Sequence, residues 1–186
     1  MASFIKSANS QSDWIFDNVK EICFVGRSNV GKSSLINVLS NKKIAKTSNT
    51  PGRTQLANFF DFQSFRIVDL PGYGYSSVSK SKKLILLNII DEYLNNRQNL
   101  VGVIQICDIN VITQQDIEMA NFLQKKFQNH YIFLNKADKY SKSHFDNNKY
   151  KIANYLGVDV NVLLSISTKN KLNIDKALEI IKSFLK

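Results

Sequence analysis

Nearly continuous apolar blocks alternate with amphipathic blocks along most of the chain, and their order predicts an α/β protein. The apolar runs at 21–25, 100–107 and 130–135 are typical of strands that are covered on both faces. Further strands are expected at 56–62, 64–69 and 160–165. Helix-like runs occur at 32–40, 80–97, 113–128, 145–156 and 173–185.

Two of the expected helices show the 3.6-residue spacing of an amphipathic helix. The apolar face expected for the helix at 80–97 consists of Leu84, Leu87, Ile90 and Leu94. The corresponding face of the helix at 173–185 consists of Ile174, Leu178, Ile181 and Leu185. Both faces are expected to pack against a sheet.

The strands at 56–62 and 64–69 are separated by so few residues that we expect a hairpin, with one strand antiparallel at the sheet edge. The other strands alternate with helices, which predicts parallel strands joined by helical crossovers. We therefore expect a three-layer α/β fold: a six-stranded, mostly parallel sheet with one antiparallel edge strand and helices on both faces. Ligands of such folds bind where the parallel strands end.

The length of 186 residues suits one domain with a substantial core. We expect this domain at 20–186, after an N-terminal extension at 1–19 in which Trp14, Ile15 and Phe16 pack back onto it. No apolar run approaches the roughly 18 residues of a membrane span, and no signal-peptide pattern is present, so the expected location is cytoplasmic. The two cysteines lie in predicted core strands without metal-binding or redox spacing, so we expect buried, reduced thiols.

The net charge of +10 favours a polyanionic partner, such as nucleic acid or an anionic membrane surface. A general bias toward lysine is the alternative, because no run of five or six basic residues stands out. The charge therefore predicts a class of partner without locating the contact.

Residues 26–33 read Gly-Arg-Ser-Asn-Val-Gly-Lys-Ser, a complete phosphate-binding loop. The loop stands between a predicted strand and a predicted helix, so the positive end of the helix dipole points at the phosphates. Its glycines let backbone N–H groups surround a polyphosphate, Lys32 reaches the outer phosphates, and the Ser33 hydroxyl can ligate Mg²⁺. These features predict a nucleoside triphosphate site.

Asp69-Leu70-Pro71-Gly72 follows another predicted strand. Asp69 is placed to hold the Mg²⁺ shell, and the backbone N–H of Gly72 can meet a γ-phosphate. This pattern is weak by itself, because any turn may carry it. Its position at the end of a strand that follows the phosphate-binding loop strengthens it.

Asn135-Lys136-Ala137-Asp138 follows the predicted strand at 130–135 and indicates guanine recognition. The Asp138 carboxylate can accept hydrogen bonds from N1–H and the exocyclic amine of guanine, whereas adenine would leave it unpaired. Lys136 would lie along the base, and Asn135 would tie the segment to the phosphate-binding loop. A solvated turn after a strand is the alternative.

Two further segments carry weaker motifs. Ser165-Ile166-Ser167 ends the last strand, where a backbone N–H would meet guanine O6, although a serine-rich turn before a helix looks the same. Thr50-Pro51-Gly52-Arg53-Thr54-Gln55 lies in a polar stretch where a mobile loop can bring Thr54 onto Mg²⁺ when a γ-phosphate is present. Thr50 is the competing ligand.

Together these segments closely resemble the EngB/YsxC (YihA) family of bacterial P-loop GTPases. The resemblance rests on Gly-Arg-Ser-Asn-Val-Gly-Lys-Ser-Ser at 26–34, Thr-Pro-Gly-Arg-Thr-Gln at 50–55 and Asp-Leu-Pro-Gly-Tyr-Gly-Tyr at 69–75, and it extends from about residue 20 to the C-terminus. It implies a Ras-like GTPase domain with GTP and GDP as ligands. It also implies a role in assembly of the large ribosomal subunit, and this role is needed for normal cell division and septation.

The resemblance assigns roles to individual residues. It implies Ser33 and Thr54 as Mg²⁺ ligands, and Asp69 joins them through its position at the strand end. The residues expected to act in catalysis are Lys32, Thr54 and Gly72. The nucleotide contacts that it implies are Gly26, Arg27, Ser28, Asn29, Val30, Gly31, Lys32, Ser33, Ser34, Gly52, Arg53, Thr54, Gln55, Leu56, Asp69, Leu70, Pro71, Gly72, Asn135, Lys136, Ala137, Asp138, Ser165, Ile166 and Ser167.

Two segments depart from the family pattern. Family members tend to carry Asp-x-Arg after the fourth strand, where this chain reads Asp108-Ile109-Asn110, so any partner contact of that arginine is altered. Ile166 stands where a small residue is usual, which leaves the register of the 165–167 segment open.

The residue after Asp-x-x-Gly bears on the rate of hydrolysis. Many GTPases orient the attacking water with a glutamine there, whereas this chain has Tyr73, so we expect slow intrinsic turnover. Asn29 favours potassium (K⁺) as an activator, as in potassium-activated GTPases, with a loop-stabilising role as the alternative. Arg27 and Arg53 are candidate electrophiles, although phosphate-loop or RNA contacts are favoured for both.

The segment Tyr73-Gly74-Tyr75, with Lys80, Lys82 and Lys83 after it, predicts an effector surface. Packing of the tyrosines on the next helix, with solvated lysines, is the alternative.

The sequence leaves three candidate functions. The leading one is a monomeric GTPase switch on ribosomal RNA or a large-subunit precursor. A GTPase at the membrane or division site is the second, although no lipidation motif supports anchoring. A metabolic kinase or ATPase is disfavoured by the guanine motif.

Overall fold

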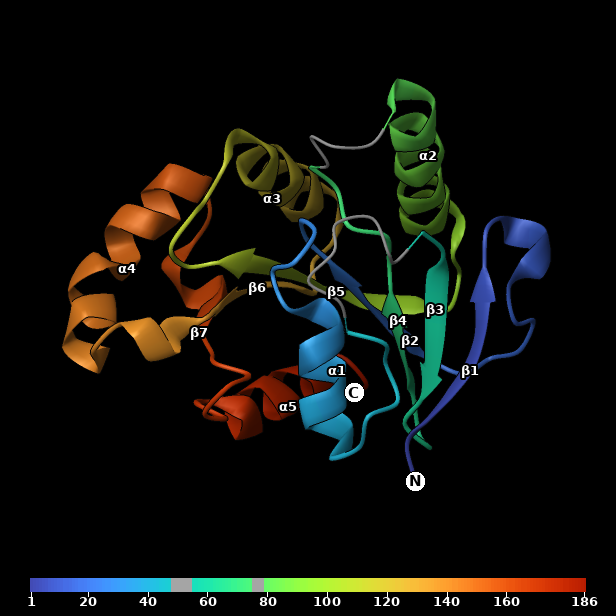
Figure 1. Cartoon of the computed structure of the whole chain (residues 1–186), viewed down its shortest axis with the longest axis horizontal. Coiled ribbons are helices and arrows are strands. Elements are labelled where there is room, and N and C mark those ends of the chain that lie inside the picture. The colour runs from blue at the N-terminus through green and yellow to red at the C-terminus, as the bar shows by residue number, and fades with distance from the viewer. Residues whose placement is uncertain (48–54, 75–78) are drawn as a thin grey trace.

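The computed structural model describes residues 1–47, 55–74 and 79–186, without the side chains of residues 142 and 144 (Figure 1). Its strands are β1 (Ser3–Ala8), β2 (Glu21–Val25), β3 (Ala57–Asp61), β4 (Arg66–Asp69), β5 (Leu100–Asp108), β6 (His130–Asn135) and β7 (Leu163–Ser165). Its α-helices are α1 (Lys32–Ser40), α2 (Lys80–Asn96), α3 (Gln114–Lys126), α4 (Lys142–Leu156) and α5 (Ile174–Ser183). Short 3₁₀ turns are η1 (Gln11–Asp13), η2 (Ala137–Lys139) and η3 (Val160–Val162).

One mixed sheet organises the described residues, with the strand order β1-β3-β4-β2-β5-β6-β7. Strands β4, β2, β5, β6 and β7 run parallel, whereas β3 pairs antiparallel with both of its neighbours. Helices α1 and α5 cover one face of the sheet, and α2, α3 and α4 cover the other. The expected three-layer α/β fold is confirmed.

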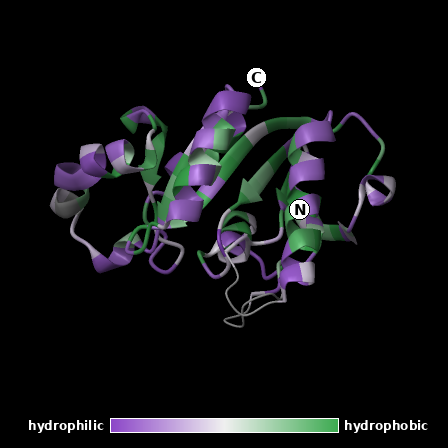
Figure 2. Ribbon diagram, turned by 90° about the horizontal axis from the view of Figure 1, so that it is seen from above, coloured by the Kyte–Doolittle hydropathy of each residue, from purple (hydrophilic) through white to green (hydrophobic). Residues whose placement is uncertain are grey.

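Alternation along each central strand divides the core between the two faces. In β2, Ile22 and Phe24 pack with the α1 and α5 side chains, while Cys23 and Val25 pack with α2 and α3. The side chains of successive strand residues point to opposite faces, so an all-apolar run is what a doubly covered strand requires. Figure 2 shows the same arrangement, with green strands enclosed by helices whose outer faces are purple.

The N-terminal segment adds a seventh strand that the sequence pattern did not predict. Strand β1 pairs antiparallel with β3, so β3 lies second from the edge and β1 takes the edge position. The pairing satisfies backbone groups that β3 would otherwise leave unpaired, and the ring of Phe4 packs edge-on against Phe60. Trp14 is buried as expected, but Phe16 is 77% exposed.

A buried carboxylate fastens the N-terminal segment to the sheet. Glu21 is fully buried and accepts hydrogen bonds from Arg97 Nε (2.6 Å) and Tyr93 Oη (2.7 Å), and Arg66 also donates to it. Arg97 in turn donates to the Ile15 carbonyl (2.8 Å). Because a buried charge is tolerated only when it is paired and hydrogen-bonded, this cluster fixes the start of β2 against α2.

Helix α2 is rotated relative to the expected face. Its buried residues are Leu86, Ile89, Ile90, Tyr93 and Leu94. Leu84 and Leu87, which the spacing placed in the core, are 61% and 38% exposed. Ile90 and Leu94 are buried as expected, and the hydrogen bond of Tyr93 to Glu21 lies on the same buried face. The C-terminal helix agrees better with expectation, since Ile181 is fully buried and Ile174, Leu178 and Leu185 are partly covered.

Other boundaries differ by few residues. Strand β7 is shorter than the expected 160–165 because η3 occupies its first half, with the Asp159 carboxylate accepting the Asn161 N–H (2.7 Å). Both cysteines are free thiols within the core, and burial raises the pKa of each. Among the described residues, no helix is long and apolar enough to cross a bilayer.

His130, the first residue of β6, is a buried titratable group. It is 4% exposed, and its Nε2 has no hydrogen-bond partner among the described residues. Burial lowers the pKa of His130 from 6.5 to about 4, because the imidazolium would lose its hydration. The folded state therefore holds this side chain neutral at pH values where the unfolded chain is protonated.

We expect the free energy of unfolding to fall by about 2 kcal/mol between pH 7.5 and 5 through His130 alone. The unfolded state takes up a proton below its pKa of about 6.5, whereas the folded state does so only near 4, so acidification favours unfolding across this window. Urea denaturation of the wild type and of His130→Met at both pH values measures the difference. An equal pH dependence in the two proteins would contradict this assignment.

Candidate nucleotide-binding site

The phosphate-binding loop connects β2 to α1 and depends on two glycines. A Cβ on Gly26 would lie 2.3 Å from the Ile106 carbonyl oxygen, and one on Gly31 would lie 2.2 Å from Asn135 Nδ2. Both glycines also have positive φ angles, which side chains disfavour. Gly31 precedes the first turn of α1 and has no side chain that could accept hydrogen bonds from the first N–H groups of the helix. These N–H groups are therefore left for an anion.

Lys32 is nearly buried beneath this loop. Its Nζ donates to the carbonyl oxygens of Gly26 (3.1 Å) and Arg27 (3.4 Å). Burial lowers the pKa of Lys32, and the nearby charge of Asp69 opposes that shift. An anion bound in the loop would offset the cost of burying this ammonium group. The buried lysine therefore favours phosphate binding.

Ser33 and Asp69 form the polar end of the site at the end of β4. Ser33 Oγ donates to Asp69 Oδ2 (2.8 Å), while Asp69 Oδ1 is buried without a partner among the described residues. Burial raises the pKa of Asp69, and Lys32 and the Ser33 bond oppose this. A hydroxyl beside an unsatisfied carboxylate oxygen fits Mg²⁺ held by Ser33 directly and by Asp69 through water.

Asn135 joins the phosphate-binding loop to the opposite side of the site. Its Nδ2 donates to the Val30 carbonyl (2.8 Å), and its Oδ1 accepts the Thr168 N–H (3.2 Å). Lys136 follows in the left-handed conformation and donates to Asp108 Oδ2 (2.7 Å). Burial acts to raise the pKa of Asp108, but the bonds from Lys136 and Asn110 lower it overall. The expected tie between Asn135 and the loop is thus present.

Asp138 is anchored by the last sheet segment. Its Oδ1 accepts from Ser167 Oγ (2.8 Å), and the Ala137 N–H donates to the Ile166 carbonyl (3.1 Å). Ile166 is fully buried in the core between the sheet and helices α1 and α5. Its side chain therefore points away from the site expected to bind the base. Ser165 ends β7, and its carbonyl accepts from Asn173. This arrangement places Ser167 beside Asp138.

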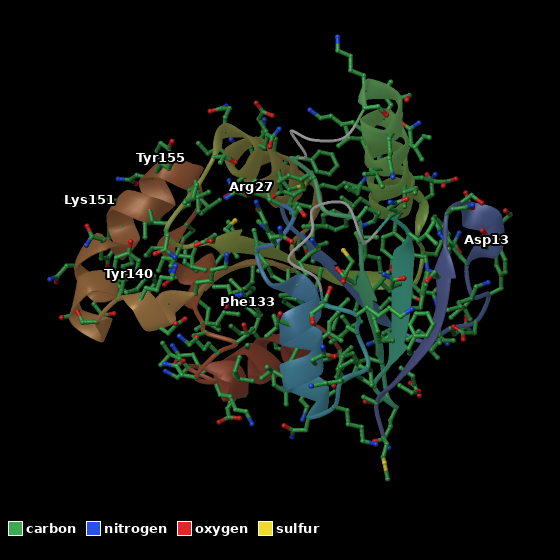
Figure 3. The ribbon with its side chains drawn as sticks, viewed as in Figure 1. Asp13, Arg27, Phe133, Tyr140, Lys151 and Tyr155 are labelled. Carbon is green, nitrogen blue, oxygen red and sulfur yellow. The ribbon has the colours of Figure 1, made fainter. Side chains whose placement is uncertain are left out.

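Two residues near the phosphate-binding loop have side chains placed differently from the expectations. The guanidinium of Arg27 extends toward α3, where Nε pairs with Asp116 (2.8 Å), so it does not face the phosphates as an electrophile would (Figure 3). Tyr73 is 5% exposed and packs against α3 and β5. It therefore does not belong to an exposed effector surface.

Some predicted site residues lie outside the described residues: Thr50, Pro51, Gly52, Arg53, Thr54 and Tyr75. Gln55 and Leu56 are exposed and lie just before β3. With Ser33 and Asp69 they line a cavity of about 480 Å³ that extends over β3 to Phe4 and Ser7 of β1.

Sequence reasoning missed Gln105, Asp116 and Thr168, which organise the site, and it named Asp108 only as part of a departure from the family pattern. One signal was available, because Thr113 and Asp116 have the spacing of a capping box, which the structure forms. Gln105 and Thr168 are single polar residues without a local pattern.

Comparison with known proteins agrees with this geometry. Residues 21–136 match the family of 50S ribosome-binding GTPases. The chain is 60% identical to a probable GTP-binding protein EngB of Malacoplasma penetrans over the full length of both. The chain belongs to the EngB family of GTPases. The resemblance drawn from the motifs is confirmed, and guanine nucleotide binding and GTP hydrolysis follow from membership.

Other EngB relatives support the same conclusion. The chain is 47% identical to the probable EngB of Mycoplasma genitalium, covering 93% of this chain and 91% of that one. A crystal structure of a probable EngB superposes with a TM-score of 0.74 at 26% identity, covering 88% of this chain and 97% of the other. Era, solved with MgGDPNP and a segment of 16S ribosomal RNA, shares the fold alone (TM-score 0.69, 19% identity, 90% and 57% covered).

We predict that Ser33→Ala weakens Mg²⁺-dependent GDP binding at least about tenfold, because a direct metal ligand is lost. Titration with fluorescent GDP in excess Mg²⁺ and in EDTA measures the effect. The matched control is Ser40→Ala, which removes a hydroxyl from the last turn of the same helix. Equal affinities of wild type and Ser33→Ala in Mg²⁺ would contradict the assignment.

Asp138→Asn should change the base that the site prefers from guanine to xanthine. An amide at this position donates to the C2 carbonyl of xanthine, whereas it leaves the guanine amine without an acceptor. We expect GDP affinity to fall by about 100-fold or more, and xanthosine diphosphate to bind better than GDP. Competition between the two nucleotides measures the switch. Asp146→Asn, which removes an exposed carboxylate of α4, should leave both affinities unchanged.

Proposed function

We propose that this GTPase is a Mg²⁺-dependent switch that binds the large ribosomal subunit or its precursor through ribosomal RNA. The match of residues 21–136 to the 50S ribosome-binding GTPases carries the proposal. The net charge of +10 supports an RNA contact, because lysine and arginine side chains neutralise phosphates. The solved complex of Era with ribosomal RNA supports RNA binding by a protein that shares this fold.

In this proposal the site residues divide the work between the phosphates and the base. The N–H groups at the start of α1 bind the phosphates, and Lys32 exchanges its carbonyl partners for phosphate oxygens. Ser33 and Asp69 hold Mg²⁺, which neutralises charge on the phosphates, with Thr54 as the third ligand expected from the sequence. Asp138 selects guanine, and the Gly72 N–H meets the γ-phosphate.

The buried position of Tyr73 supports slow intrinsic hydrolysis. Its phenol donates to Asp116 (3.0 Å) and accepts from Gln105 (3.1 Å), so this residue does not orient a water for attack. Acceleration then comes from a partner or an ion. Asn29 adopts the left-handed conformation at the tip of the loop, and K⁺ binding beside it remains a prediction from the sequence.

The family resemblance supports the cellular role, in which work on the large subunit is needed for normal cell division and septation. A cytoplasmic location and a monomeric state are expectations from the sequence and complete the proposal. A GTPase that acts at the membrane or division site without touching the ribosome is the alternative. The two differ in whether purified ribosomal subunits suffice for nucleotide-dependent binding.

We expect the protein to co-sediment with purified large ribosomal subunits when it holds a non-hydrolysable GTP analogue and to be released with GDP. Binding should persist at moderate salt, since a specific contact uses more than counterion release. Small subunits serve as the matched polyanion control. Equal retention in both nucleotide states and on both subunits, vanishing with salt, would reduce the interaction to non-specific RNA binding and leave the alternative standing.

A further inference from the structure

A second buried carboxylate lies beside the nucleotide site, and the guanine and phosphate motifs do not account for it. Asp116, in the first turn of α3, is fully buried. Its Oδ2 accepts from Arg27 Nε (2.8 Å) and from the backbone N–H (2.9 Å) and hydroxyl (3.0 Å) of Thr113. Its Oδ1 accepts from Tyr73 Oη (3.0 Å). One side chain therefore joins the phosphate-binding loop, the segment after Gly72 and the start of α3.

The backbone of Tyr73 is held as firmly as its side chain. Its N–H donates to the Gly26 carbonyl (3.3 Å), and its carbonyl accepts the Ser28 N–H (3.2 Å). On the other side, Gln105 Nε2 donates to the phenol oxygen (3.1 Å) and to the Asp116 carbonyl (2.8 Å). Burial raises the pKa of Tyr73, so the phenol is a neutral donor to Asp116.

Close packing leaves little freedom around this junction. Gly74 has a φ of +80°, and a Cβ there would lie 2.5 Å from Gln115 Oε1 of α3 and 3.2 Å from the Arg27 side chain. Arg27 lies near α3 in Figure 3, and its side chain reaches Asp116 in the first turn of that helix. A buried carboxylate that loses a donor becomes costly, so these partners must keep their relative positions.

We propose that Asp116 is a positioning residue for Gly72 and that it couples the γ-phosphate to the start of α3. The proposal rests on the proposed contact between the Gly72 N–H and the γ-phosphate. Tyr73 is covalently joined to Gly72, so holding Tyr73 against the loop pre-positions that N–H. GTP uses this N–H and GDP does not, so the Asp116 junction sets the preference between the two nucleotides.

The test removes one hydroxyl from the junction. Tyr73→Phe keeps the ring and loses the bond to Asp116, and it should weaken binding of a non-hydrolysable GTP analogue about tenfold relative to GDP. The matched control is Tyr93→Phe. Tyr93 is another buried tyrosine, on α2, and its phenol donates to the buried Glu21 at the opposite ends of the strands. That control should cost similar stability but leave the ratio of the two affinities unchanged.

Asp116→Asn supplies a second variant of the same junction. If Tyr73 acts through Asp116, the double variant should change the affinity ratio no more than Asp116→Asn does alone. Additive effects, or a ratio that shifts equally in Tyr73→Phe and Tyr93→Phe, would reduce the junction to a purely structural role. Urea denaturation of each variant separates loss of fold from loss of nucleotide preference.

Amide hydrogen exchange distinguishes failure of this proposal from failure of the Gly72 contact. In the wild type, exchanging GDP for the GTP analogue should protect residues 69–74 and also change exchange at 113–117. Loss of the second change in Tyr73→Phe supports the coupling. Protection at 69–74 without any change at 113–117 would overturn the role of Asp116, whereas no change at 69–74 would overturn the Gly72 contact itself.

Discussion

The side-chain amide of Asn135 holds the two halves of the nucleotide site together. It donates to Val30 in the phosphate-binding loop and accepts from Thr168 in the segment after β7. The approach is so close that only glycine fits at position 31. The loop expected to bind the phosphates and the segment expected to recognise the base are more than a hundred residues apart in sequence, and this amide joins them directly.

Two buried carboxylates likewise hold separate segments together, one at each end of the parallel strands. Glu21 lies at the amino ends of the parallel strands and secures the N-terminal segment through Arg97. Asp116 lies near the carboxyl ends and secures Arg27 and Tyr73. Each also takes a hydrogen bond from a buried tyrosine. Because a buried carboxylate tolerates few arrangements, each of these clusters specifies a single packing of loop against helix.

Much of the fold and of the site was predictable because the relevant signals are local. The run at 130–135 and the helix at 32–40 match the structure at both ends, since an apolar block and a glycine-rich loop mark their limits. The predicted face of α2 was right for Ile90 and Leu94 but wrong for Leu84 and Leu87, because leucine and isoleucine occur around most of the helix surface and spacing alone does not identify the buried side. Strand β1 was missed because its residues, Ser-Phe-Ile-Lys-Ser-Ala, give no clear alternation.

The sequence by itself determined the family and its guanine nucleotide, and it predicted the parts of the site: a loop for phosphates, a hydroxyl and a carboxylate for Mg²⁺, and a carboxylate for guanine. These are encoded in short segments, because backbone conformation and ligand type depend on neighbouring residues. Only the tertiary structure decided where Arg27 and Tyr73 point. Their partner Asp116 lies 89 and 43 residues away, and such pairings arise from how strands and helices pack rather than from any local pattern. The same holds for Ile166, whose side chain the fold turns into the core while its backbone serves the site.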